Sequence, residues 1–120
     1  MKTRGDWFEQ RAADWLMSEG WTIVARNYQT RLGEIDIIAL EQNTLVFIEV
    51  RARKNPQFAS ASGSVDWRKQ RKVSRSAQLF LKQQPKWSNW ACRFDVIAFE
   101  PTQSSAREME LRWIRSAFTT

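Results

Sequence analysis

The sequence predicts an α/β fold, with a central mixed sheet of about five strands flanked by helices. Two stretches have the apolar periodicity of helices, and five runs are rich in the β-branched and aromatic residues that favour strands. They follow one another as a helix, three strands, a second helix and two strands. Because this order is typical of helices packed against one sheet, the 120 residues are expected to form one domain.

The first helix and three strands occupy the amino-terminal half of the chain. Helical periodicity runs from about residue 6 to residue 19 and stops at Gly20, a residue typical of the position just after a helix. Residues 41–44 form the connection between the second and third strands. The three strands are predicted at 21–26, 33–39 and 45–51.

The second helix and the last two strands occupy the carboxy-terminal half. The segment 54–64 is rich in Ser, Ala, Asn, Pro and Gly and is predicted to be a mobile loop. The helix is predicted from about residue 66 to residue 84, with Ser64 or Asp66 as its N-cap. The last two strands are predicted at 91–99 and 108–115, the latter with the alternation of an edge or half-exposed strand.

Composition excludes several kinds of catalytic site. The chain has no histidine, which excludes imidazole bases, Ser-His-Asp and Cys-His sites, and histidine-based zinc sites. Its one cysteine, Cys92, cannot form an internal disulfide and is interpreted as a buried small hydrophobic residue. The sequence contains no signal peptide and no apolar run long enough to span a bilayer, so a cytoplasmic protein is expected.

The charge balance indicates the kind of partner. Nineteen Lys and Arg residues against thirteen Asp and Glu residues give a net charge of +6. A positive field of this kind favours polyanions, and nucleic acid in particular. Because imidazole is absent, any chemistry would depend on carboxylates, Lys or Arg, hydroxyls and a metal ion.

Two carboxylates are predicted to face each other between the second and third strands. An even-length loop, either residues 42–43 or residues 41–44, places Asp36 opposite Glu49 and Glu34 opposite Arg51. Directly opposed side chains lie about 5 Å apart on one face, where like charges are destabilising. A divalent cation between Asp36 and Glu49 is the simplest explanation for this pair.

A third acid is predicted to join them from the first helix. At about 100° per residue, Glu9 lies on the same side as Ala12 and Leu16, so its carboxylate falls within the apolar face. One interpretation is that Glu9 reaches the edge of this face or caps a local group. The other is that Glu9 meets Asp36 and Glu49 where the helix packs on the sheet.

The second helix is predicted to have one inward-facing amide and one basic face. Gln70 lies on the same side as the apolar Ala77 and Leu81. The opposite side carries Arg68, Arg71, Lys72, Arg75 and Lys82. This face is either solvated or in contact with phosphate groups. Arg53 and Lys54, which follow the third strand, favour phosphate contact.

A fourth acid, Asp95, is interpreted as structural. It shares a strand face with Ile97 and Phe99, so its side chain is expected to be partly buried. A buried carboxylate needs a partner, and the adjacent Arg93 or another basic group would supply it. We therefore assign Asp95 to the core rather than to a catalytic site.

In order along the chain stand Gly5-x-x-x-Glu9, Arg26-Asn27, Gly33-Glu34-Ile35-Asp36, Leu45-Val46-Phe47-Ile48-Glu49-Val50-Arg51-x-Arg53, Lys69-Gln70 and Arg93-Phe94-Asp95-Val96. This ordered set closely resembles the YraN family of small bacterial proteins, over about residues 4–99. The resemblance implies a restriction-endonuclease-like fold, related to archaeal Holliday-junction resolvases and to the nuclease domains of the PD-(D/E)XK superfamily. The endonuclease-like core would span about residues 4–100.

The resemblance further implies metal-dependent hydrolysis of phosphodiester bonds. Asp36, Glu49 and the carbonyl of Val50 would hold Mg²⁺ or Mn²⁺, and Glu9 would orient a water or help to bind a second ion. Gln70 matches the polar residue on the helix that follows. A homodimer acting on branched or otherwise structured DNA is expected, because related resolvases pair. Nucleic acid would be bound by Arg53, Lys54, Arg68, Lys69, Arg71, Lys72 and Arg75.

The chain departs from the family at Arg51, where relatives usually have lysine. Arginine keeps the charge, but its pKa above about 12 prevents it from serving as a general base. Arg51 would stabilise the transition state or pair with Glu34, and Lys54 or Lys69 would replace the missing lysine. Two functions therefore stay open: a metal-dependent nuclease, and a nucleic-acid-binding or assembly protein that keeps the fold without cleavage.

Overall fold

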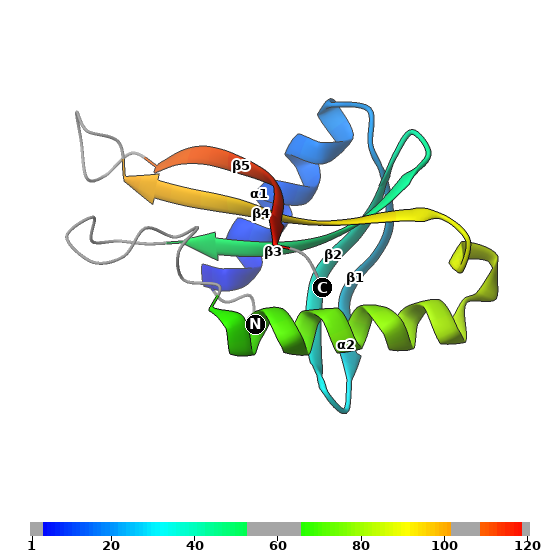
Figure 1. Ribbon diagram of the computed structural model, residues 1–120. Helices are drawn as coiled ribbons and strands as arrows, with labels where there is room; N and C mark the ends of the chain where they lie inside the picture. Colours follow the sequence, from blue (N-terminus) through cyan, green and yellow to red (C-terminus); the bar gives the residue numbers. More distant parts are fainter. Residues whose placement is uncertain (1–3, 53–65, 102–108, 119–120) are drawn as a thin grey trace.

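The computed structural model describes residues 4–52, 66–101 and 109–118 and shows an α/β fold with two α-helices and a five-stranded sheet (Figure 1). Helix α1 spans Arg4–Ser18 and helix α2 spans Trp67–Gln83. A short 3-10 turn, η2 (Pro85–Trp87), lies between α2 and β4. The strands are β1 (Thr22–Thr30), β2 (Gly33–Glu41), β3 (Thr44–Ala52), β4 (Ala91–Pro101) and β5 (Met109–Phe118).

The strands lie in the sheet in the order in which they follow along the chain, β1-β2-β3-β4-β5. Neighbouring strands are antiparallel, except for β3 and β4, which are parallel. Parallel neighbours need a crossover connection, and the segment that contains α2 supplies it. The mixed sheet and the predicted order of elements are therefore confirmed.

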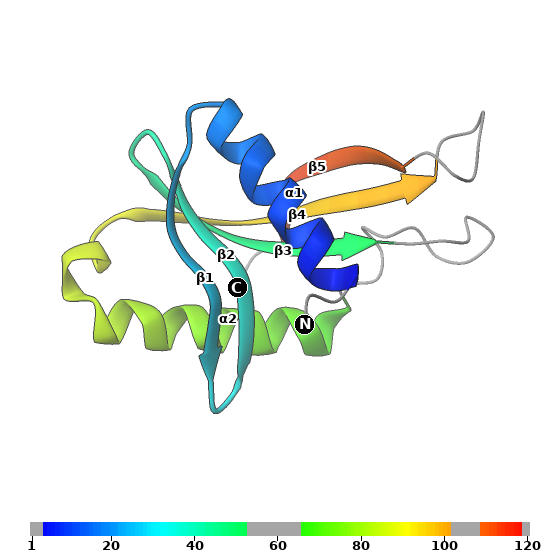
Figure 2. The same cartoon turned by 180° about the vertical axis from the view of Figure 1, so that it is seen from behind.

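The two helices cover opposite faces of the sheet. Helix α1 lies behind the sheet in Figure 1 and in front of it in Figure 2. On this face, Leu16 of α1 packs with Ile48 and Ile97 in one buried cluster. On the other face, Phe80 of α2 packs in a second cluster with Phe47 of β3. Burial of apolar side chains on both faces therefore holds the sheet between the helices.

Local signals end α1 and begin α2 close to the predicted residues. At the end of α1, Gly20 has a φ of 88°, and the N–H of Trp21 donates to the carbonyl of Leu16 at 3.0 Å. This is the hydrogen bond of a Schellman motif, which needs a residue in the left-handed region. At the start of α2, the side chain of Asp66 accepts a hydrogen bond from Lys69 N–H at 2.9 Å, so Asp66 is the N-cap.

The strands continue beyond their apolar runs. The predicted first strand ends at residue 26, but β1 continues to Thr30, because polar residues there pair with the start of β2. The connection between β2 and β3 is residues 42–43, the shorter of the two predicted loops. Strand β5 ends at Phe118, three residues after its predicted end at 115. The predicted loop 54–64 lies outside the described residues.

Asp95 and Cys92 of β4 lie in different surroundings. Asp95 is fully buried, which is more than the partial burial expected, and it pairs as expected with Arg93, whose Nε is 2.9 Å from Asp95 Oδ1. Asp95 also accepts hydrogen bonds from Trp113 Nε1 and from the N–H of Ser116, both at 2.9 Å, and these tie β5 to β4. The prediction for Cys92 is wrong: the residue is exposed, because it is second in its strand, outside both core clusters.

Candidate functional site

Three carboxylates from two elements meet beside β2. Glu9 belongs to α1, whereas Glu34 and Asp36 belong to β2, and ligand oxygens from the three lie within 4.8 Å of one another. All three residues are half-buried. Glu34 was not among the expected ligands, although its spacing gives a signal: residues two apart on a strand share a face. We call Glu9, Glu34 and Asp36 the acidic cluster.

Strand β2 loses its backbone partners at Asp36. Pairing with β3 follows the predicted register from Glu41 to Ile37 and stops one residue before Asp36. Two hydrogen bonds to side chains follow: Val50 N–H donates to Asp36 Oδ2 at 2.9 Å, and Asp36 N–H donates to Glu49 Oε2 at 3.3 Å. In the pairing of β2 with β1, Asp36 again has no partner, although Ile35 and Ile37 on either side of it do. Asp36 and Glu49 therefore lie where the sheet opens, each bonded to the backbone of the opposite strand.

The direction of side chains along β2 changes at the same place. Ile35 and Ile38 both pack in the cluster under α2, although they are three residues apart. Strict alternation would put them on opposite faces. Ile37, between Asp36 and Ile38, packs in the cluster under α1. At this irregularity, Asp36 lies close to both Glu9 of α1 and the buried Glu49 of β3.

That buried acid, Glu49, has one oxygen without a well-aligned hydrogen bond. Its side chain is 0% exposed, and Oε2 accepts the bond from Asp36 N–H. Among the described residues, none forms a hydrogen bond to Oε1. Two cations lie near this oxygen instead, Lys69 Nζ at 3.1 Å and Arg51 Nη2 at 3.8 Å. Glu49 is therefore held in the apolar interior by ion pairs on one side and by the backbone on the other.

The predicted pair of Glu34 and Arg51 is not formed. The two residues would oppose each other only if β2 and β3 kept pairing beyond Ile37, and the strands have separated by then. Arg51 turns towards Glu49, and Glu34 turns towards Glu9 and Asp36. The hairpin register is confirmed over its apolar part, but it does not extend to this pair.

Asn27 of β1 binds two members of the acidic cluster. With its amide oriented as its surroundings require, Nδ2 donates to Glu9 Oε2 and to Glu34 Oε1, each at 3.0 Å. Asn27 also has a φ of 52°, a conformation that asparagine tolerates better than most residues. Backbone strain of this kind is concentrated at functional sites. The sequence motif contains Asn27, but nothing in it predicts these contacts.

Burial and crowding raise the pKa values of three of these carboxyl groups. Burial, followed by the hydrogen bond to Asp36 and its charge, raises the pKa of Glu9 to about 7. Burial, followed by the charge of Asp36, raises the pKa of Glu49 to about 7, and Lys69 and Arg51 only partly oppose this. The pKa of Glu34 is raised for the same two reasons. Near neutral pH the site therefore retains protons that a bound cation would displace.

The donor set suits a divalent cation that prefers oxygen ligands. Mg²⁺ and Mn²⁺ bind carboxylate oxygens, and opposite ligands of an octahedral ion with bonds of about 2.1 Å lie about 4.2 Å apart. The oxygens of the acidic cluster lie within 4.8 Å of one another, which is close to that span. Oε1 of Glu49, which is paired with Lys69 and Arg51, is a further buried acceptor next to Asp36. The geometry thus favours Glu34 as a third ligand, with Glu49 adjacent.

The other expected site residues lie in several places. Val50 is buried and contributes its N–H to Asp36. Gln70 is half-buried on the first turn of α2, next to Lys69. Arg53 and Lys54 lie outside the described residues. The exposed cations of α2 are Arg68, Arg71, Lys72, Arg75 and Lys82, which we call the basic face.

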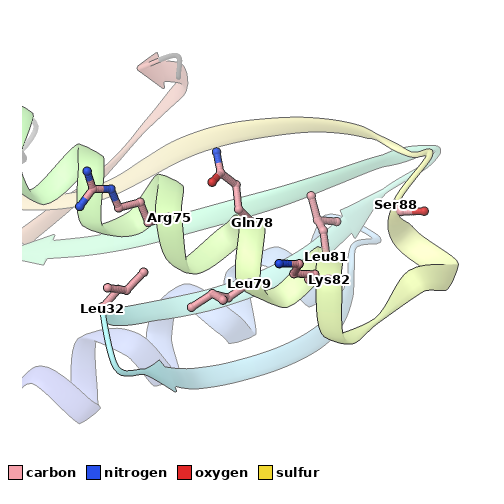
Figure 3. A pocket seen from close by; sticks show the side chains of 7 residues that line it. All are labelled: Leu32, Arg75, Gln78, Leu79, Leu81, Lys82 and Ser88. Carbon is pink, nitrogen blue, oxygen red and sulfur yellow. The ribbon is translucent and has the colours of Figure 1, made fainter.

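A separate pocket of about 570 Å³ lies along the second half of α2 (Figure 3). Leu79 and Leu81 of α2 and Leu32 of the β1–β2 turn give it apolar walls, and Arg75 and Lys82 place two cations at it. None of the site carboxylates lines it. The pocket therefore adjoins the basic face and is distinct from the acidic cluster.

Neither described helix is long and apolar enough to cross a membrane.

Comparison with known proteins identifies the family. The model of the uncharacterised protein family UPF0102 matches residues 8–99. A UPF0102 protein of Alcanivorax borkumensis is 46% identical over 117 residues, which are 98% of this chain and 92% of that protein.

Two pseudomonad proteins are similar over most of their length. A UPF0102 protein of Pseudomonas fluorescens Pf-5 is 42% identical, and one of Pseudomonas putida GB-1 is 39% identical, each over 110 residues. In both comparisons the match covers 92% of this chain and 88% of the relative. The acidic cluster, Glu49 and Lys69 all fall within the family match. The chain belongs to the UPF0102 family, which is the YraN family that its sequence resembles.

Proposed function

We propose that this protein is a metal-dependent nuclease that hydrolyses phosphodiester bonds in branched or otherwise structured DNA. The observation that carries the proposal is the acidic cluster at the opening of the sheet, beside the buried carboxylate of Glu49. Three half-buried carboxylates beside the fully buried Glu49 repel one another, and Lys69 and Arg51 offset this only in part, so a divalent cation would stabilise the site. The neighbouring basic face would hold a polyanion.

Each site residue has a separate task in this proposal. Glu9, Glu34 and Asp36 would hold Mg²⁺ or Mn²⁺, which when bound activates water and offsets charge on the phosphate. Asn27 keeps the carboxylates of Glu9 and Glu34 in place through its two hydrogen bonds. Glu49 fixes the position of Asp36 by accepting its backbone N–H.

The reaction consumes one water for each bond cleaved. The water oxygen forms a bond to phosphorus, and the bond between phosphorus and the leaving oxygen breaks. One water proton passes to a carboxylate and then to solvent, and the leaving oxygen takes up a proton to become a hydroxyl.

The basic face would position the substrate. Its cations are exposed on the helix that also carries Lys69, so a nucleic acid backbone along α2 would pass the site. Contacts between cations and phosphates give affinity without reading sequence. This suits a substrate that is recognised by its shape. Arg53 and Lys54 follow β3 directly and belong to the same proposal.

A cleavage assay with matched substrates tests the proposal. Purified protein with Mn²⁺ is incubated with end-labelled four-way junction, flap and linear duplex DNA of the same sequence. We expect nicking of branched DNA, and a loss of about 100-fold or more in Asp36→Asn and Glu9→Gln. Glu19→Gln, which neutralises an exposed acid just after α1, is the control and should nick at the wild-type rate.

A second function is favoured by Arg51. Since arginine replaces the lysine usual in the family, the fold could serve as a nucleic-acid-binding protein that does not cleave. Binding of branched DNA with no metal-dependent nicking of any of the three substrates would favour this function over the first. In that case Asp36→Asn should leave the affinity for DNA unchanged or raise it, because a negative charge is removed.

A further inference from the structure

Lys69 of α2 reaches the buried acid of β3. Its Nζ lies 3.1 Å from Glu49 Oε1, and 31% of its side chain is exposed, so the ammonium group lies between the interior and solvent. Lys69 is thus more buried than the cations of the basic face, which are all exposed. A lysine in this position neutralises part of the charge of Glu49 and keeps donors free, since an ammonium group has three.

Helix α2 is fixed at three levels, and these contacts hold Lys69 in place. Asp66 caps the first turn through the N–H of Lys69 itself. One turn later, α2 lies so close to β2 that a Cβ built on Gly33 would be 3.3 Å from Lys72 Cβ. Further along, Ser76 Oγ is 3.0 Å from Thr30 Oγ1 of β1. The position of Lys69 is therefore set by the fold and not by the ion pair alone.

Arg51, which occupies the position of the family's lysine, is less well placed. Its Nη2 is 3.8 Å from the same Glu49 oxygen. Its buried Nε has no hydrogen-bond partner among the described residues. The planar guanidinium group presents its donors in a fixed fork, whereas an ammonium group on a flexible stem can turn towards a phosphate oxygen. Of the two cations at Glu49, Lys69 is both nearer and more adaptable.

We infer that Lys69 supplies the ammonium group that contacts the scissile phosphate, in place of the missing strand lysine. This inference rests on the proposed nuclease function. Lys69 donates hydrogen bonds to a non-bridging phosphate oxygen and stabilises the negative charge that develops there. Arg51 serves as a second, more distant charge. In this protein the ammonium group therefore comes from α2, whereas the family usually has it on the strand that corresponds to β3.

A set of three variants separates catalysis from simple charge neutralisation. Lys69→Met removes the ammonium group, and Lys86→Met removes an exposed lysine in η2 as the control. The double variant R51K/K69M places a lysine on β3 instead, and so keeps an ammonium group available near Glu49. With Mn²⁺ and branched DNA, we expect Lys69→Met to lose about 100-fold in nicking rate, and R51K/K69M to regain at least 10-fold of it. Lys86→Met should be unchanged.

The melting temperature of each variant is measured alongside. If Lys69 only neutralises Glu49, R51K/K69M will recover stability without recovering cleavage, and the inference is overturned. It is equally overturned if Lys69→Met nicks at the wild-type rate. In both cases the wild-type protein cleaves, so the proposed function stands.

A binding experiment without turnover covers the case in which the wild-type protein cleaves nothing. Thymidine 5′-monophosphate is added to the Mn²⁺-loaded protein, and broadening of its ³¹P resonance reports a phosphate held beside the ion. We expect Lys69→Met to weaken this binding at least 5-fold and Lys86→Met to leave it unchanged. Equal broadening in wild type and Lys69→Met would overturn the contact between Lys69 and phosphate, whatever the outcome of the cleavage assay.

Discussion

The backbone N–H of Val50 donates a 2.9 Å hydrogen bond to Oδ2 of Asp36, at the level where β2 and β3 cease to pair. A side chain thus provides the acceptor that the neighbouring strand would otherwise supply. Asp36 therefore has two roles, one in closing the gap between the strands and one in the acidic cluster. Its substitutions should separate these roles.

Asp36→Asn should give a folded protein without activity. The amide keeps an oxygen for Val50 N–H and removes one negative charge from the acidic cluster. We expect the melting temperature without divalent ions at pH 8 to be equal to or a few degrees above that of wild type. Asp36→Ala leaves a buried N–H without its acceptor and should be less stable than Asp36→Asn by about 1–3 kcal/mol. Denaturant unfolding of the pair measures this difference, and equal stabilities would contradict the structural role.

Stability without divalent ions should fall as pH rises from 5 to 8. Glu9 and Glu49 have pKa values of about 7 in the folded protein, against 4.5 ordinarily. Between these values the folded state binds more protons than the unfolded state, so the free energy of unfolding decreases with rising pH. We expect the melting temperature to drop by several degrees over this range, measured by circular dichroism with a chelator present.

Two controls accompany this measurement. The double variant E9Q/E49Q carries neither titrating group and should have a much flatter dependence on pH. Millimolar Mn²⁺ should raise the wild-type melting temperature at pH 8 more than at pH 5, because protons compete with the cation for the same oxygens. A wild-type melting temperature that rises from pH 5 to pH 8 in the chelator would contradict the raised pKa values.

Substitutions of Asn27 should distinguish its backbone from its amide. Asn27→Gly keeps access to the positive φ and loses the hydrogen bonds to Glu9 and Glu34, whereas Asn27→Ala loses both features. We expect Asn27→Ala to be less stable than Asn27→Gly by about 1 kcal/mol. Both should be destabilised more at pH 8 than at pH 5, because the amide donors stabilise the ionised carboxylates. Denaturant unfolding at the two pH values tests this.

Asp95→Ala should be among the most damaging substitutions, for reasons unrelated to metal binding. It removes the acceptors for Trp113 Nε1 and Ser116 N–H and leaves Arg93 with one fewer partner. Loss of one member of a buried charge network costs about 3–5 kcal/mol. Glu100→Ala, which breaks a partly exposed pair with Arg112, should cost at most about 1 kcal/mol. Equal losses in urea unfolding would argue against this role of Asp95.

The basic face should determine the salt dependence of DNA binding. Each neutralised phosphate contact contributes about 0.9 to the slope of log K against log salt concentration. The double variant R71Q/R75Q should therefore bind branched DNA more weakly, with a slope shallower by up to about 2. Fluorescence anisotropy from 50 to 300 mM salt measures this. A reduced affinity with an unchanged slope would show that the two arginines do not contact phosphates.

The fold could be predicted because each element carries a local signal. Gly20 and Asp66 mark helix ends by mechanisms that act within a few residues. The register of β2 on β3 follows from the period of two and a short loop, which is why the level of Asp36 and Glu49 could be anticipated. The end of β1 was less accessible, since its polar residues are strand only because β2 pairs with them. The end of β5 depends on the pairing of Phe118 with Phe94 across the sheet.

The site itself could be predicted only in part, because its closest contacts connect distant elements. The meeting of Lys69 with Glu49 depends on how α2 settles against β2. The hydrogen bonds of Asn27 depend on a local break in β1. The expected pair of Arg51 and Glu34 requires β2 and β3 to keep pairing beyond Ile37. The two strands diverge there, and Arg51 pairs with Glu49 instead. Each case turns on tertiary geometry that no periodicity encodes.

The acidic cluster joins two layers of the molecule, with Glu9 on the helix and Glu34 and Asp36 on the sheet. Repulsion between these carboxylates consequently weakens the packing of α1 on the sheet, and protonation or a bound divalent ion removes the repulsion. Undocking of α1 becomes easier in alkaline, chelated solution, and its amide protons would then exchange ahead of those of the central strands. The stability of the packing of α1 on the sheet thus depends on the ionic composition of the surrounding medium.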